Sequence, residues 1–185
     1  MTRHKIMLCI ALGLFSSLNV QANDYVGLTR CKMCHKKKEM GNQFGVWSET
    51  KHAKAYEVLG TEEAKTAGKT LGVDDPQNDG RCLICHTTGY TASAEAKAKI
   101  EVANGVTCEA CHGAGSEYKS KDVHSGNYEA GVAAGMNRFK TDEEKMAICS
   151  QCHVAERDGN KNPNFKEFNL AEFLKKIHHP LTKSE

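Results

Sequence analysis

The sequence predicts one mainly α-helical domain with much irregular structure. Three observations lead to this fold class. The chain has 185 residues, the length of one ordinary domain. Short helix-forming segments are separated by polar loops, and the alternation of apolar and polar residues that marks β-strands is almost absent. Aromatic residues make up only 6% of the chain, so something other than side chains must supply apolar mass to the core.

The first 22 residues have the features of a secretory signal peptide. Arg3 and Lys5 provide a basic start, an apolar run covers about residues 6–18, and a small-residue pattern precedes the expected cleavage point. The run is shorter than the roughly 20 apolar residues that span a bilayer. No later segment is apolar enough to span one either. We therefore expect a signal peptide at 1–22, a single domain at 23–185 and a periplasmic location.

Removal of this leader changes the charge balance. The whole chain has 25 Lys and Arg against 23 Asp and Glu, a net charge of +2. The leader contains two of the basic residues and none of the acidic ones, so the remaining chain is neutral. Nucleic-acid-binding proteins carry a basic excess on one face, so the sequence predicts no nucleic-acid partner.

Five segments are expected to be helical because of their capping residues, composition or helix-stopping residues. They are Phe44–Leu59, closed by Gly60; a helix that begins at Thr61; Ser93–Ala103, rich in Ala, Glu and Lys; a helix that begins at Thr141 and runs toward Cys149; and Leu170–His178, stopped by Pro180.

One motif occurs four times. Eight of the nine cysteines form Cys-x-x-Cys pairs, and a histidine directly follows each pair. The first cysteines of successive motifs are 51, 26 and 41 residues apart, so the motifs are not a solenoid repeat. The motifs comprise Cys31, Cys34 and His35; Cys82, Cys85 and His86; Cys108, Cys111 and His112; and Cys149, Cys152 and His153.

Cys-x-x-Cys-His is the signature of covalent c-type haem attachment. The two thiols form thioethers with one porphyrin, and the adjacent histidine becomes the proximal iron ligand. Zinc sites, redox dithiols and disulfides also use cysteine pairs, but none of them explains a histidine after every pair. The sequence thus predicts four covalently bound haem c groups. Too few residues remain to separate four haems, so we expect a compact multihaem cytochrome c fold built around closely packed haems.

A haem with one histidine ligand has an open sixth position, and few histidines remain to fill it. We expect His52 and His124 to be distal ligands. Two neighbouring histidines on one helix point about 100° apart, so one of His178 and His179 ligates and the other does not. The fourth iron is left open or takes another ligand. Methionine is an alternative, although it more often fills cores; the candidates are Met40, Met136 and Met146.

The chain resembles the tetrahaem cytochrome c-554 family, a member of which takes electrons from hydroxylamine oxidoreductase in ammonia-oxidising bacteria. The four motifs are general to cytochromes c, and their order and the contexts of two distal histidines are more specific. The resemblance lies in Trp47–Ala55, in Gly105–Gly113, in the loop that begins at His124 and in the late helix that ends at His178.

The resemblance implies ligand pairs that cross between motifs. His124 would lie opposite His35, His52 opposite His112, and His178 opposite His153. The second haem, on His86, would be five-coordinate. One departure concerns the third motif, where the family has Gly-Pro-Gly and this chain has Gly113-Ala114-Gly115.

Two functions compete at this point. The leading hypothesis is a periplasmic carrier that transfers electrons between redox partners. The alternative is a reductase that acts on nitric oxide, hydroxylamine or nitrite at an open His86 haem, so whether the chain is an enzyme is left open and no catalytic residue is assigned. The expected partners are periplasmic or membrane-associated redox proteins, with a multihaem oxidoreductase as one candidate. The lysines at 36–38 form either a solvated face or a docking patch for an acidic redox partner.

Overall fold

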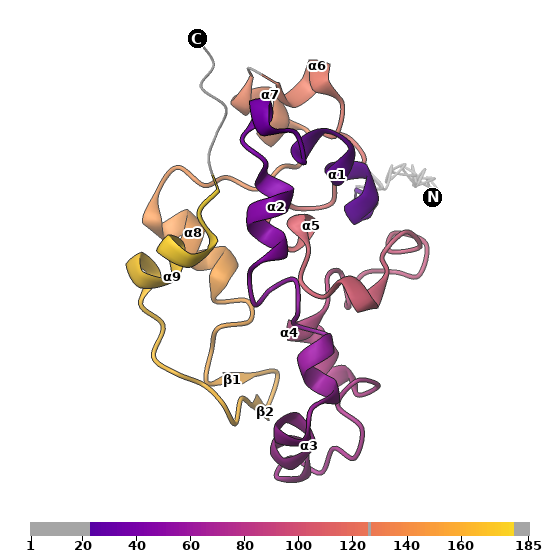
Figure 1. Cartoon of the computed structure of the whole chain (residues 1–185), viewed down its shortest axis with the longest axis vertical. Coiled ribbons are helices and arrows are strands. Elements are labelled where there is room, and N and C mark those ends of the chain that lie inside the picture. The colour runs from indigo at the N-terminus through magenta and orange to yellow at the C-terminus, as the bar shows by residue number, and fades with distance from the viewer. Residues whose placement is uncertain (1–22, 126, 180–185) are drawn as a thin grey trace, which may run out of the picture.

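The computed structural model describes residues 23–125 and 127–179 (Figure 1). The predicted signal peptide at 1–22 lies outside the described residues. Short helices joined by long loops make up most of the described chain, which confirms the predicted fold class. The helices are α1 (Leu28–His35), α2 (Gln43–Ser48), α3 (Glu62–Lys69), α4 (Gly80–His86), α5 (Cys108–His112), α6 (Lys121–His124), α7 (Tyr128–Ala133), α8 (Asp142–Cys149) and α9 (Leu170–Ile177).

Three short 3₁₀ helices and one hairpin complete the described elements. They are η1 (Lys38–Met40), η2 (Glu57–Gly60) and η3 (Val102–Asn104), with β1 (Glu156–Arg157) paired antiparallel to β2 (Asn160–Lys161). None of the helices within 23–125 and 127–179 has the length and apolar composition to cross a bilayer.

The helices form two groups along the long axis of the molecule (Figure 1). Helices α1, α2, α5, α6 and α7 lie toward one end, where α1 contacts both α2 and α5. Helices α3 and α4 lie toward the other end, and α8, α9 and the hairpin lie along one side. Three of the four motifs therefore begin and end within a single helix, and the fourth begins at the last residue of α8.

Two of the motif-bearing helices are fixed by capping. Thr141 and Glu144 form a capping box at the start of α8, and the side chain of Asp79 accepts the amide hydrogen of Arg81 at the start of α4. The side chain of Thr61 accepts the amide hydrogen of Ala64 at the start of α3. The predicted helix starts at Thr61 and Thr141 are confirmed, and α9 ends one residue before the predicted limit at His178.

Ser93–Ala103 was expected to be helical and is instead a series of turns followed by η3. The composition favours a helix, but packing against the first described residues competes with it. Tyr25 donates its amide hydrogen to the carbonyl of Ala96 at 2.8 Å, and Lys97 Nζ donates to the carbonyl of Tyr90 at 2.8 Å. Helix propensity is a weak preference that tertiary contacts of this kind override.

Phe44–Leu59 was expected to be one helix and is divided into α2, a run of turns and η2. The break has a specific cause, because the carbonyl of His52 accepts the amide hydrogen of Val106 at 3.0 Å. The carbonyl of Ala55 lies 2.6 Å from the Nδ1 atom of His86. Both carbonyls thus bind groups from distant segments rather than continuing a helix.

The described residues contain very little buried apolar surface. The buried hydrophobic side chains are Ala55, Leu59 and Val73. Three small or medium side chains cannot stabilise a domain of this length, because burial contributes only about 25 cal/mol per Å² of apolar surface. This finding agrees with the expectation that another group supplies apolar mass.

A buried carboxylate joins the start of the domain to the third motif. Glu109 is only 2% exposed. Its Oε1 atom accepts the amide hydrogens of Val26 and Gly115, and its Oε2 atom accepts that of Gly27, each at 2.8 Å. Such charge-assisted hydrogen bonds are about twice as strong as neutral ones. Glu109 therefore holds the segment before α1 against α5.

Replacing Glu109 with alanine should destabilise the haem-loaded protein by about 3 kcal/mol or more, because three buried amide groups lose their acceptor. Thermal unfolding followed by circular dichroism measures this loss. Glu117→Ala, at an exposed position in the same loop region, is the matched control and should leave the midpoint nearly unchanged. Equal midpoints for the two variants would contradict the role given to Glu109.

Candidate haem-binding sites

Six histidine rings lie in three facing pairs. The ring centroids are 6.2 Å apart for His35 and His124, 6.0 Å for His52 and His153, and 5.9 Å for His112 and His179. In each pair one member belongs to a Cys-x-x-Cys-His motif and the other comes from a different segment. The predicted distal residues His52 and His124 are thus each brought beside a motif histidine.

This separation has the value that a shared iron requires. Metal–imidazole bonds are about 2 Å long, so two rings on opposite sides of one iron have centroids roughly 6 Å apart. The described residues hold no group of three or more His, Cys, Asp or Glu side chains around a common metal position. A haem iron needs no such group, because the porphyrin supplies four nitrogens and leaves only two axial positions. The residues therefore fit haem.

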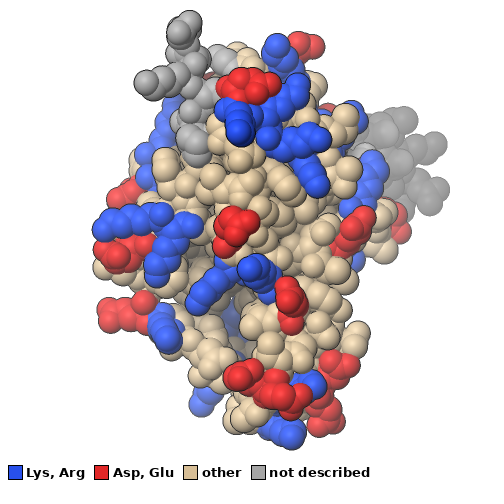
Figure 2. Space-filling model, viewed as in Figure 1, with Lys and Arg blue, Asp and Glu red and all other residues tan. Residues whose placement is uncertain are grey.

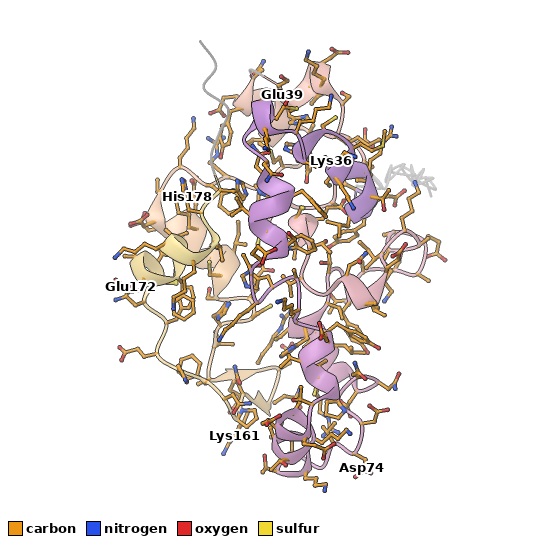
Figure 3. All side chains as sticks on the ribbon, in the orientation of Figure 1. Lys36, Glu39, Asp74, Lys161, Glu172 and His178 are labelled. Carbon is orange, nitrogen blue, oxygen red and sulfur yellow. The ribbon has the colours of Figure 1, made fainter. Side chains whose placement is uncertain are left out.

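Two of the pairs differ from those implied by the resemblance. His52 lies beside His153 rather than His112, and His179 lies beside His112. His178, the expected partner of His153, is exposed at the end of α9 (Figure 3). The reason is the direction of the chain after α9. His178 has left the helix with an extended backbone, and the next residue turns inward.

His179 is less exposed than His178. Its Nδ1 atom is buried and has no hydrogen-bond partner within the described part of the chain. The sequence predicted that only one of His178 and His179 would ligate. It had no signal for which one, because the choice depends on where the helix stops.

Backbone and side-chain acceptors orient several of the histidine rings. The Nδ1 atom of His86 lies 2.6 Å from the carbonyl of Ala55, and that of His124 lies 2.8 Å from the carbonyl of Ser120. The Nδ1 atom of His35 lies 3.2 Å from the side-chain oxygen of Gln43. A ring that donates from Nδ1 presents its Nε2 lone pair to a metal, which is the usual arrangement of ligating histidines.

His86 differs from the other motif histidines. The ring contacts found among the described residues pair His35, His112 and His153 with another histidine, and they include none for His86. Its proximal orientation is nevertheless fixed by Ala55.

Burial favours the neutral form of the paired imidazoles. It lowers the pKa of His112 to about 4, with smaller contributions from His179, His35 and His124. Burial likewise lowers the pKa of His52, His153 and His179. Only the neutral imidazole has a lone pair for iron, so these residues are held in the form that ligates.

The cysteines of different motifs also meet. The thiol of Cys31 lies beside that of Cys108, and the thiol of Cys85 lies beside that of Cys152. Burial, together with the neighbouring Cys149 and Cys108, raises the pKa of Cys111 to about 11. The first motif therefore lies against the third, the third near the fourth, and the fourth against the second.

The segment around His52 is fixed by a close backbone approach that the sequence indicated only as a glycine. Gly105 has a φ of +67°, and a Cβ atom there would lie 2.7 Å from the carbonyl oxygen of His52. Trp47 Nε1 donates to the carbonyl of Val106 at 2.9 Å. The stretch before the third motif thus carries the backbone that positions His52.

An aromatic wall surrounds the fourth motif histidine. The ring of His153 stacks on Phe168 at 4.8 Å between centroids and contacts Phe173 at 5.6 Å. Phe139 lies 5.2 Å from His112 in the same measure. These flat apolar groups suit the edge of a porphyrin.

Comparison with known proteins agrees with this geometry. The family model described as "Cytochrome c554 and c-prime" matches residues 30–113. Cytochrome c-554 of Nitrosomonas europaea is 28% identical over 169 residues, which cover 81% of this chain and 69% of that protein. This chain is related to the cytochrome c-554 family. The resemblance seen in the sequence is confirmed, and it supports the expectation of four covalently bound haem c groups.

The fold of the chain is also that of a cytochrome c-554. The solved structure of the reduced state of cytochrome c554 from Nitrosomonas europaea superposes with a TM-score of 0.53. The match covers 84% of each chain at 24% sequence identity. The compact multihaem cytochrome architecture predicted from the motifs is thereby confirmed.

The two neighbouring histidines at the end of α9 can be told apart by substitution. His179→Ala should convert one low-spin haem to high-spin, because His112 would lose the ring that faces it. His178→Ala is the matched control and should leave the spin states unchanged. Electron paramagnetic resonance of the oxidised protein measures both. An additional high-spin haem in the His178 variant alone would reverse the assignment.

Proposed function

We propose that the chain is a periplasmic electron carrier in which three haems have two histidine ligands and the second has one. The observation that carries the proposal is the spacing of the three histidine pairs, 5.9–6.2 Å between ring centroids. When bound, each haem supplies an iron that accepts and returns one electron. Rings fixed on both sides of an iron keep its coordination constant, which suits electron transfer.

The proposed ligand pairs are His35 with His124, His112 with His179, and His153 with His52. His86 is the proposed single ligand of the second haem. Each pair joins segments far apart in the sequence, so ligation also ties the short helices together. The eight motif cysteines, Cys31, Cys34, Cys82, Cys85, Cys108, Cys111, Cys149 and Cys152, are the proposed covalent attachment points.

The contacts between cysteines support a continuous route for electrons. The Cys31–Cys108 and Cys85–Cys152 contacts join the first motif to the third and the second to the fourth. Cys149 is close enough to Cys111 to help raise its pKa, so the third motif lies near the fourth. We infer an order of first, third, fourth and second motif, which differs from the order in the sequence.

The alternative function, reduction of a small molecule at the second haem, rests on His86. A single ligand would leave one face of that iron available to nitric oxide, hydroxylamine or nitrite. Arg81, the nearest basic residue in sequence, is already engaged. Its guanidinium binds Asp79 at 2.7 Å and donates to the carbonyls of Leu71 and Gly72. This engagement favours the carrier over the reductase.

Two measurements separate the functions. The oxidised protein should contain one high-spin haem and three low-spin haems in electron paramagnetic resonance. Reduced protein mixed with nitric oxide, hydroxylamine or nitrite should show no sustained turnover. Four low-spin haems would contradict single ligation of the second haem, and catalytic turnover would favour the reductase.

A basic patch at one end of the molecule supports a charged partner. The patch consists of Lys32, Lys36, Lys37 and Lys38, all exposed, on and after α1. Figure 2 shows basic side chains at this end and acidic ones gathered at the opposite end around α3, and Figure 3 labels Lys36 and Asp74 at these two ends. Because α1 bears the first motif, we infer that an acidic redox protein docks beside the first haem.

Replacing Lys36, Lys37 and Lys38 with glutamine should slow oxidation of the reduced protein by hexacyanoferrate(III), an anion, by about threefold or more at low salt. Oxidation by a cationic ruthenium hexaammine should not slow. Stopped-flow absorbance measures both rates. The control replaces Lys54, Lys65 and Lys69, three exposed lysines near the opposite end. Equal slowing by the two triple substitutions would contradict electron transfer at the basic patch.

A further inference from the structure

A hairpin with a two-residue turn fixes the backbone of Arg157. In this hairpin Arg157 pairs with Asn160, and Asp158 and Gly159 form the turn. Both turn residues have positive φ, +52° and +77°. Asp-Gly is a preferred sequence for such tight turns, because its backbone twist matches that of the flanking strands. The backbone of Arg157 is therefore fixed by its neighbours rather than being part of a loose loop.

The guanidinium of Arg157 lies at the junction of the second and fourth motifs. Its Nη1 atom donates to the carbonyl of Gln151 at 2.5 Å and lies 3.8 Å from the sulfur of Cys152. The guanidinium also lies near the sulfur of Cys85. These two sulfurs are haem attachment points, so a charge placed beside them lies beside the edges of two haems.

Within the described ranges the ion pair found for Arg157 is with Asp158, whose carboxylate faces solvent. Arg157 Nε lies 3.4 Å from a carboxylate oxygen of Asp158. The Asp158 side chain is 72% exposed and that of Arg157 is 28% exposed. Water screens the aspartate more strongly than the arginine, so a net positive charge acts on the junction.

We propose that Arg157 raises the reduction potentials of the haems attached to the second and fourth motifs. A ferric haem carries one more positive charge than a ferrous haem, so a fixed cation favours the reduced state. The charge and dielectric around a protein-bound iron centre are established determinants of its potential. Arg157 is a positioning and tuning residue that ligates no iron. The inference deepens the proposed electron-carrier function and rests on it.

The expected consequence is directional. The cation increases the fraction of time that an electron spends on the haems attached to the second and fourth motifs. A tenfold change in the reduction equilibrium of a one-electron couple corresponds to about 59 mV. We expect Arg157→Gln to lower the potentials of the affected haems by roughly that amount, and the haems of the first and third motifs to keep theirs.

Three variants of the haem-loaded protein test the proposal by spectroelectrochemical titration. Arg157→Gln should lower the reduction potentials of the haems attached to the second and fourth motifs. Arg157→Lys, which keeps the charge, should leave these potentials near their wild-type values. Asp158→Asn removes the counter-charge and should raise the reduction potentials of the same two haems. Asparagine tolerates the positive φ at this position and suits the tight turn, so the hairpin should persist.

A purely structural role for Arg157 predicts a different pattern. In that case Arg157→Gln and Arg157→Lys would shift the potentials alike, and Asp158→Asn would have no effect. Either result overturns the proposal. If Arg157→Gln fails to fold, the near-wild-type potentials expected of Arg157→Lys and the upward shift expected of Asp158→Asn still decide.

Haem content and spin states are measured first on the same samples. Fewer than four haems, or a different count of high-spin haems in the wild type, would contradict the proposed function and remove the basis of the inference with it. Four haems with the expected spin states but unshifted potentials would overturn the role of Arg157 alone.

Discussion

Two imidazole rings that share one iron must face each other at about 6 Å, and most of this structure follows from that constraint. The chain has few buried apolar side chains of its own among the described residues, and its helices have at most eight residues. Helices of this length are not stable alone in water. We propose that ligation from both sides supplies the missing stability, because each histidine pair would then bind two distant segments to one haem plate.

The surrounding hydrogen bonds hold the rings in place rather than forming regular secondary structure. The carbonyls of His52 and Ala55 are withdrawn from a helix so that they bind Val106 and His86. Gly105 permits the backbone approach that this requires, and Glu109 ties the first described residues to the third motif. The irregular loops are thus the part of the fold that sets the geometry of the haem-binding sites.

The sequence was sufficient for features encoded locally and insufficient for those set by long-range packing. The Cys-x-x-Cys-His spacing and the Thr141 capping box are both local. The spacing predicted the haem c groups, and the capping box predicted the start of α8. The pairing of His52 with His153 joins residues about a hundred positions apart, and no local signal specifies it. Ser93–Ala103 failed as a helix for the same reason, because contacts from Tyr25 decide its backbone. His178 was preferred over His179 because of the resemblance, whereas the structure brings His179 beside His112.

The central claim is that three irons lie between specific histidine pairs and a fourth beside His86. A crystal structure of the haem-loaded protein, with iron positions located by anomalous scattering, tests it most directly. We expect irons midway between His35 and His124, between His52 and His153, and between His112 and His179, and one on His86 without a second protein ligand. An iron between His52 and His112, or a second protein ligand opposite His86, would contradict it.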